Sequence, residues 1–144
     1  MGPPWTDCCE TADVTGTATA RAHPALRLVL CDDAVAYPLM VAAWLRALDG
    51  LELVAVLPDL AALRARVADL APDVVLLDVV LPDGRVDRGL VDALRTAGGP
   101  DLRVVLVSNH LPDDLEQIAA EAGVDAWCSK IDGADGLLGA LQQA

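Results

Sequence analysis

Short runs of consecutive apolar residues alternate along this chain with segments whose apolar residues recur every three or four positions. Unbroken apolar runs are typical of parallel strands covered on both faces, whereas the longer spacing is typical of helices. The expected strands cover residues 26–30, 51–57, 73–79, 102–107 and 125–128. In the third strand, Asp78 follows four apolar residues and comes shortly before a Pro-Asp-Gly turn. Asp78 is therefore expected at the carboxyl end of a central strand.

Helical spacing predicts five helices after these strands. The first helix is expected to bury one face, formed by Tyr37, Met40, Val41, Trp44, Leu45 and Leu48. The other helices are expected over residues 60–70, 90–98, 112–122 and from 134 onward. Asp59 precedes the second helix and is expected to cap it. The loop that precedes the third helix extends to Arg88, which is unusually far.

The alternation of strands and helices predicts an α/β fold, a doubly wound five-stranded parallel sheet with helices on both faces. The 144 residues suffice for one domain with a proper core, but not for two comfortable ones. Residues 1–24 are rich in Thr, Ala, Gly and Pro without periodicity, so we expect a disordered N-terminal leader there. The folded domain is expected over residues 25–144.

Charge and cysteine spacing narrow the classes of partner. The net charge is −12, with 22 acidic and 10 basic side chains, which argues against direct nucleic-acid binding by this chain. The apolar runs are far shorter than the roughly 18–20 residues of a membrane span, so no membrane partner is expected. The four cysteines lack metal-ligand or Cys-x-x-Cys spacing, and Cys31 and Cys128 lie in apolar strands. We expect reduced, buried thiols and a cytoplasmic protein.

The residues at the ends of the predicted strands have chemistry that fits together. Asp32 and Asp33 follow the first strand, Asp78 ends the third, Ser108 follows the fourth and Lys130 follows the fifth. Right-handed crossovers bring these strand ends to one edge of the sheet. Carboxylates crowded there repel one another unless a cation lies among them, and Mg²⁺ prefers such oxygen ligands. Lys130 and Ser108 suit phosphoryl oxygens, and an aspartate such as Asp78 can form an aspartyl phosphate.

Taken singly, these residues have simpler interpretations. Asp78 is compatible with a turn residue or a helix cap. Lys130 is compatible with an ordinary solvated lysine. The matching residues on neighbouring strands favour a shared site instead.

In this combination and order, the residues resemble a response regulator receiver domain of two-component signalling. The resemblance covers the chain from residue 26 onward and rests on Asp32-Asp33, Asp78 with Pro82 four residues later, Ser108 and Lys130. It implies a flavodoxin-like (βα)5 fold with strand order 2-1-3-4-5. It also implies a signalling domain that catalyses only its own phosphorylation and dephosphorylation, rather than an enzyme.

The resemblance assigns a role to each site residue. Asp78 would be the phosphoacceptor, which receives a phosphoryl group from a histidine kinase or phosphotransfer protein with Mg²⁺ as cofactor. The Mg²⁺ ligands would be Asp32, Asp33, Asp78 and the backbone carbonyl of Val80. Lys130 and Ser108 would contact the phosphoryl group, and Ser108 and Trp127 would form the switch, although core packing explains Trp127 equally well. The fourth helix, fifth strand and fifth helix would then change as a surface that binds a downstream protein target or forms a homodimer.

Three features depart from the pattern that the family usually shows. Asn109 replaces the small residue that usually follows the strand-four hydroxyl, and the loop at residues 84–89 is long. Asn109 would alter the rate of phosphorylation or dephosphorylation, and the long loop would shield or reshape the site. Ile131 stands where many members carry a cis-proline, and members with a C-terminal helix-turn-helix often lack that proline. His110 is compatible with a general base or a metal ligand, but a solvated loop histidine is the simpler interpretation.

Three functions compete on this evidence. The first is a phosphorylatable receiver that works through protein contacts, either alone or as a piece of a longer transcription regulator. The second is a pseudo-receiver that serves as a constitutive docking module, with little or no phosphorylation. The third, a flavodoxin-type nucleotide binder, ranks last because Asp32-Asp33 occupies the place of its phosphate-binding loop.

Overall fold

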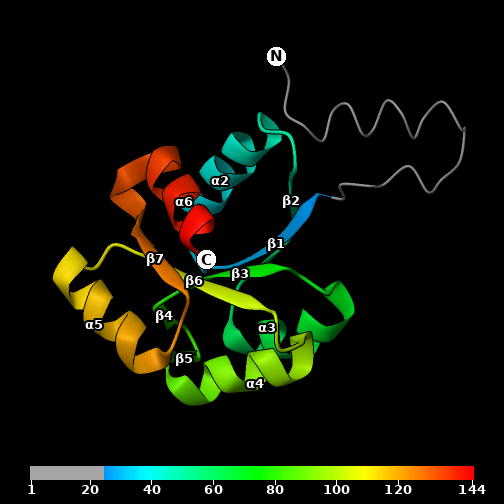
Figure 1. The fold of residues 1–144 in the computed structure, drawn as a ribbon, viewed down its shortest axis with the longest axis vertical. Coiled ribbons are helices and arrows are strands. Elements are labelled where there is room, and N and C mark those ends of the chain that lie inside the picture. The colour runs from blue at the N-terminus through cyan, green and yellow to red at the C-terminus, as the bar shows by residue number, and fades with distance from the viewer. Residues whose placement is uncertain (1–24) are drawn as a thin grey trace, which may run out of the picture.

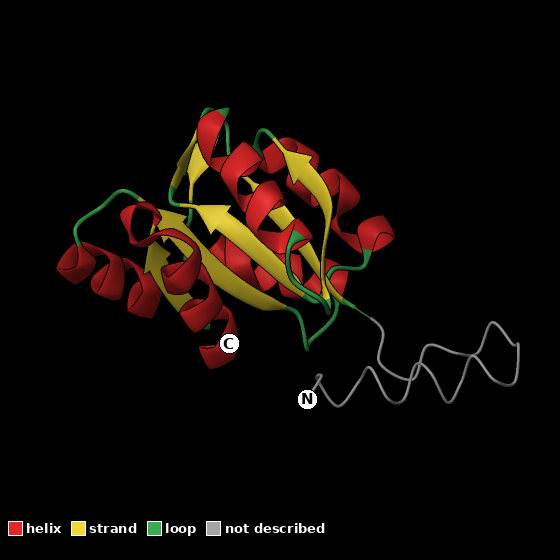
Figure 2. Ribbon diagram, turned by 90° about the horizontal axis from the view of Figure 1, so that it is seen from above, coloured by secondary structure: helices red, strands yellow, loops and turns green. Residues whose placement is uncertain are grey.

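A computed structural model describes residues 25–144, and the segment predicted to be a disordered leader, residues 1–24, lies outside the described residues. The central sheet contains five parallel strands: β1 (Leu26–Cys31), β2 (Leu51–Leu57), β3 (Val74–Asp78), β6 (Arg103–Ser108) and β7 (Ala126–Ser129). Their spatial order is β2-β1-β3-β6-β7 (Figure 1), which confirms the predicted order 2-1-3-4-5. All neighbouring pairs are parallel, so the carboxyl ends of the strands share one edge (Figure 2).

Helices cover both faces of the sheet, as the alternation of elements predicts. They are α2 (Ala36–Arg46), α3 (Leu60–Leu70), α4 (Arg88–Gly98), α5 (Pro112–Ala122) and α6 (Gly133–Gln143). In Figure 1, α2 and α6 lie on one face, and α3, α4 and α5 lie on the other. Strand β3 serves both cores because successive side chains point to opposite faces of a sheet. Val75 and Leu77 pack with the three-helix side, and Val74 and Leu76 pack with α2 and α6.

Two aspartates begin the helices of the three-helix face. Asp59 caps α3, where its Oδ1 accepts a hydrogen bond of 2.8 Å from the amide of Ala62, as predicted. Asp87 caps α4 in the same way, with 2.7 Å from its Oδ1 to the amide nitrogen of Leu90. Each cap satisfies one of the amides that a helix start leaves without an intrahelical partner. This cap explains why α4 begins at Arg88, before the first apolar position of its periodic pattern.

The first helix buries a narrower face than the sequence predicts. Tyr37, Val41 and Leu45 are buried, but Met40 is 44% exposed and Leu48 is 37% exposed. Leu48 lies beyond the end of α2 at Arg46, so helical spacing no longer determines its direction. The prediction for Leu48 was wrong because the helix ends before it, and the prediction for Met40 was wrong because that position lies at the edge of the stripe formed by Tyr37, Val41 and Leu45.

The long segment after Asp78 forms a small hairpin rather than an open loop. Strands β4 (Val80–Leu81) and β5 (Gly84–Arg85) pair in antiparallel fashion. The two carboxylate oxygens of Asp83 each accept a 2.9 Å hydrogen bond, from the amides of Leu60 and Ala61. The hairpin is therefore fastened to the amino-terminal end of α3, where a helix favours negative charge.

We expect Asp83→Ala to lower the thermal unfolding midpoint at neutral pH, because it removes both amide contacts. The amide of Leu60 is the main reason that the pKa of Asp83 is lowered. A lowered folded-state pKa contributes stability above the ordinary pKa, and this contribution disappears as the pH falls through the lowered value. The difference between wild type and Asp83→Ala should therefore shrink in acid. Asp92→Ala, on the exposed side of α4, is the matched control and should leave the midpoint unchanged.

Candidate functional site

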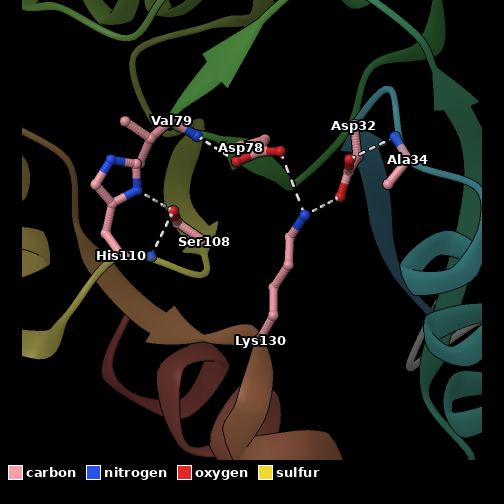
Figure 3. A network of polar contacts seen from close by, with 7 residues as sticks. All are labelled: Asp32, Ala34, Asp78, Val79, Ser108, His110 and Lys130. Atoms are coloured by element: carbon pink, nitrogen blue, oxygen red, sulfur yellow. Dashed lines mark hydrogen bonds and ion pairs between the residues drawn. The ribbon is translucent and has the colours of Figure 1, made fainter.

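Asp78 ends β3, the middle strand of the sheet. The residues Val74–Leu77 are fully buried, and the Asp78 side chain is 15% exposed at the strand end. Its Oδ1 accepts a hydrogen bond of 2.8 Å from the amide of Val79. Its Oδ2 lies 3.3 Å from the Nζ of Lys130 (Figure 3). Both contacts hold the carboxylate at the edge of the sheet, with one face open to solvent.

Asp32 lies beside it, directly after β1 on the neighbouring strand. The residue is 2% exposed, and its backbone amide donates to the carbonyl of Leu57 across 3.0 Å. Its Oδ1 accepts a 2.9 Å hydrogen bond from the amide of Ala34, which closes a tight turn before α2. Its Oδ2 lies 2.7 Å from the Nζ of Lys130. Each oxygen of this buried carboxylate thus has one partner, an amide or an ammonium group.

Lys130 links the two carboxylates from the opposite end of the sequence. It follows β7 and begins the short 3-10 helix η2 (Lys130–Asp132). Its side chain is only 10% exposed, and its Nζ lies 5.0 Å from the centre of the Tyr37 ring. The ring offers its negative face to the ammonium group, which adds to the attraction of the carboxylates. Lys130 is therefore the cation of this site in the described structure.

The site perturbs the protonation of its members. Burial raises the pKa of the Asp78 carboxyl, the charge of Lys130 lowers it by a smaller amount, and the charge of Asp32 raises it again. Burial alone would lower the pKa of Lys130, but the hydrogen bond to Asp32 and the charges of Asp78 and Asp32 raise it above 10.5. Lys130 consequently stays charged, and the negative charge of Asp78 is the one that costs free energy.

We expect Asp78→Asn to be more stable than wild type in metal-free buffer near neutral pH. Because the pKa of Asp78 is raised in the folded state, the folded protein loses stability as the pH rises through that value. An uncharged amide at this position avoids the loss. The Oδ1 of the new side chain can still accept from Val79, and Lys130 keeps Asp32. Thermal melts with EDTA should show the advantage of Asp78→Asn at about pH 7 and its decrease toward about pH 4. A constant difference across this range would contradict the assignment to Asp78 ionisation.

Three carboxylates gather where the sequence predicts a metal. One oxygen each from Asp32, Asp33 and Asp78 lies within 4.8 Å of the other two. Asp33 is exposed and Asp78 partly exposed, so the cluster faces solvent and has room for water ligands. Mg²⁺ keeps several water ligands, so a site with a small number of carboxylates and open coordination positions suits this ion. The donor set therefore fits this ion, whereas the use of the Val80 carbonyl, in β4, stays a prediction.

Ser108 lies at the end of β6, next to β3 in the sheet. It is 2% exposed, and its Oγ lies 2.6 Å from the Nδ1 of His110. The amide of His110 also donates to this oxygen across 3.1 Å. Figure 3 shows both contacts beside the Asp78–Lys130–Asp32 group. The sequence analysis favoured a solvated His110, and the structure shows instead that it binds the Ser108 hydroxyl.

Trp127 lies in β7, opposite Leu106 of β6. It is partly buried and packs against the core of the three-helix face. This environment is compatible with both interpretations, a switch aromatic and a core residue. Its switch role therefore stays a prediction.

Two contributors to the site were missed by the sequence analysis, namely Tyr37 under Lys130 and His110 at Ser108. Tyr37 was assigned to the core face of a helix, and it does lie in that core. Its spacing carried no sign of a partner near residue 130, since that contact depends on how α2 meets β7. The contact of His110 with Ser108 had a weak signal, because a hydroxyl can bond to groups two residues away.

The order of the strands and the residues at their carboxyl ends give this chain the receiver-domain fold of response regulators. Solved structures with this fold superpose on it. The signal receiver domain of the putative response regulator NarL from Mycobacterium tuberculosis is 24% identical, with a TM-score of 0.70 over 83% of this chain and 94% of that one. The response regulator domain of Thermotoga maritima CheB is 18% identical, with a TM-score of 0.70 over 83% and 96%.

A third similar structure was obtained with a phosphoryl mimic. The isolated receiver domain of RcsB from Salmonella enterica serovar Typhimurium, in the presence of the phosphomimetic BeF₃⁻, is 17% identical, with a TM-score of 0.68. The match covers 83% of this chain and 90% of that one. No protein-family model matches the chain, and no curated protein is significantly similar to it. Within residues 25–144, no helix has the length and apolar character to cross a membrane.

Proposed function

We propose that this chain is a response regulator receiver domain that accepts a phosphoryl group on Asp78. The observation that carries the proposal is the Lys130 ammonium group, which binds Asp32 at 2.7 Å and Asp78 at 3.3 Å at the carboxyl edge of the sheet. A buried salt bridge used only for stability would cost much of what it contributes, because both charges are desolvated. Asp78 is a partly exposed carboxylate beside an ammonium group and two more acidic groups, and this arrangement suits the transfer of a charged group.

The transfer uses Asp78 as nucleophile. One carboxylate oxygen of Asp78 forms a bond to phosphorus as the phosphorus–nitrogen bond of a phosphohistidine breaks, and the ring nitrogen leaves with its electron pair. Lys130 is positioned to offset the charge of the phosphoryl oxygens, and the amide of Val79 keeps the carboxylate oriented. Catalysis of this kind consists mainly of positioning and electrostatic stabilisation. Hydrolysis of the acyl phosphate by water returns Asp78 to its free form.

The proposed cofactor is Mg²⁺, held by Asp32, Asp33 and Asp78 with the backbone carbonyl of Val80. When bound, it supplies positive charge that neutralises the carboxylates and the phosphoryl oxygens. The carboxylate cluster supports this assignment. Asp32 and Asp78 share Lys130 in the described structure, so the ammonium group bridges two of the proposed ligands.

The proposed output is a switched surface formed by α5, β7 and α6. A phosphoryl group on Asp78 attracts the Ser108 hydroxyl and Lys130, which lie at the ends of β6 and β7. Movement of these residues biases the packing of Trp127 and of the helices next to it. A downstream protein target or a second copy of the chain would bind one of the two states of this surface.

Exposed apolar side chains around the site support a protein as phosphodonor. Val35, Leu111 and Ile131 follow β1, β6 and β7, and they are 76%, 70% and 83% exposed. Val80 follows β3 and is 51% exposed. Each of the four comes shortly after a parallel strand, on the side of the sheet where Asp78 lies, and exposed apolar residues near a site can serve as protein contacts. We propose a histidine kinase or phosphotransfer protein there, in the cytoplasm.

The test is the intact mass of the protein after incubation with acetyl phosphate and Mg²⁺. We expect one added phosphoryl group on wild type and none on Asp78→Asn. The controls are wild type with EDTA, which should also remain unmodified, and circular dichroism of the variant, which should match wild type. Addition to Asp78→Asn, or addition to wild type in EDTA, would contradict the proposed acceptor or the proposed cofactor.

If acetyl phosphate adds no phosphoryl group to wild type, two further measurements follow. Calorimetry measures Mg²⁺ binding, and a phosphorylated histidine phosphotransfer domain is tried as the donor. Lack of reaction with both donors, together with no Mg²⁺ binding, would overturn the proposal. It would favour the constitutive docking module, for which the exposed apolar residues around the site would be the contact surface.

A further inference from the structure

The hydroxyl of Ser108 has only one proton, and its surroundings determine where that proton points. The amide of His110 donates to the Ser108 Oγ across 3.1 Å, so the oxygen is already an acceptor. The Nδ1 of His110 lies 2.6 Å from the same oxygen. With the imidazole proton on Nε2, Nδ1 is an acceptor, and the Ser108 O–H donates to it. In this tautomer, which the proposal requires, the proton of Ser108 is committed to the imidazole.

This arrangement competes with the role proposed for Ser108. A phosphoryl group on Asp78 offers only acceptor oxygens, so Ser108 must donate its one proton to bind it. The same proton cannot serve His110 and the phosphoryl group together. In the described structure the hydrogen bonds of Asp78 come from Val79 and Lys130, and those of Ser108 involve His110.

We propose that His110 is a positioning residue that holds the Ser108 hydroxyl in the unphosphorylated orientation, so that the switch must break this bond. The proposal rests on the proposed phosphoryl site and adds a device that regulates it. Ser108 is 2% exposed, so water does not readily replace the imidazole as its partner. Loss of the imidazole should therefore free the hydroxyl for the phosphoryl group. The backbone contact from residue 110 to Ser108 persists whatever the side chain, which isolates the effect of the imidazole.

The test measures the apparent affinity for beryllofluoride, a phosphoryl mimic, at saturating Mg²⁺, in wild type, His110→Ala and His110→Asn. One hydrogen bond between neutral groups changes an equilibrium by roughly 2- to 12-fold, so we expect His110→Ala to bind beryllofluoride more tightly by about that factor. The Oδ1 of asparagine lies at the position of Nδ1 and accepts from Ser108. His110→Asn should therefore stay within about twofold of wild type. Leu39→Ala, which removes an exposed leucine side chain from α2, should also match wild type.

The outcomes separate this proposal from the one on which it rests. If wild type binds no beryllofluoride, both the proposed phosphoryl site and the proposed positioning role of His110 are contradicted. If wild type binds it and His110→Ala binds equally well or more weakly, only the positioning role of His110 is contradicted. If the affinity of His110→Asn changes as much as that of His110→Ala, the hydrogen bond is not the cause, and the positioning role is again contradicted. Mg²⁺ affinity measured without beryllofluoride should be the same in all four proteins.

Discussion

Replacing Lys130 by methionine is expected to lower the free energy of unfolding by about 3 kcal/mol in metal-free buffer. The substitution removes the ammonium group from between Asp32, whose side chain is fully buried, and Asp78, whose side chain is 15% exposed. The two carboxylates then face each other without the cation between them, and the fully buried charge of Asp32 without its partner is strongly destabilising. Urea unfolding near neutral pH measures the effect, well below the raised pKa of Lys130 at which its own contribution is lost.

Two controls separate charge from shape in this experiment. The double variant Lys130→Met with Asp78→Asn removes one of the two unpaired carboxylates and should regain a large part of the lost stability. Such a gain is a coupling between neighbouring sites, which a cycle of single and double variants measures. A Lys130→Met protein as stable as wild type would contradict the role of Lys130 as the cation of the site. Mg²⁺ should also stabilise Lys130→Met, because binding to the folded state alone raises stability. Its rate of phosphorylation should still fall sharply.

Leu77→Ala is expected to have the second large effect, a loss of about 2–5 kcal/mol in the free energy of unfolding. Leu77 is fully buried on β3, between Cys31 of β1 and Leu106 of β6. The neighbouring strands are paired on both sides and cannot move inward, so the substitution leaves a cavity in addition to losing apolar contact. Denaturant unfolding followed by far-ultraviolet circular dichroism measures the change.

The matched control for this cavity is Leu39→Ala. Leu39 has the same side chain but is 67% exposed on α2. Its truncation should change the free energy of unfolding by less than about 0.5 kcal/mol. Equal effects at Leu39 and Leu77 would show that β3 is not the central buried strand that the fold requires.

The strands, the helices and the edge at which the site forms all follow from the pattern of residues along the chain. Unbroken apolar runs such as residues 74–77 need cover on both faces, and alternation with helical spacing then leaves a parallel sheet as the consistent solution. Because parallel strands share one carboxyl edge, the positions of Asp32, Asp78, Ser108 and Lys130 after separate strands were enough to predict that they meet. The described structure confirms the strand order and the two buried free thiols, Cys31 and Cys128; Cys8 and Cys9 lie outside the described residues.

The contacts among these groups depend on how the elements pack in three dimensions. Lys130 and Asp32 are separated by 98 residues, and the contact between them depends on how β7 and β1 lie across the sheet. The contact between the Tyr37 ring and Lys130 could not be predicted for the same reason, because it depends on the packing of α2 against that face of the sheet. The segment expected to be a long loop is a hairpin, and Asp83 in it binds the start of α3. Periodicity reports which face of an element is buried, but side-chain partners depend on packing between elements that are distant in the chain.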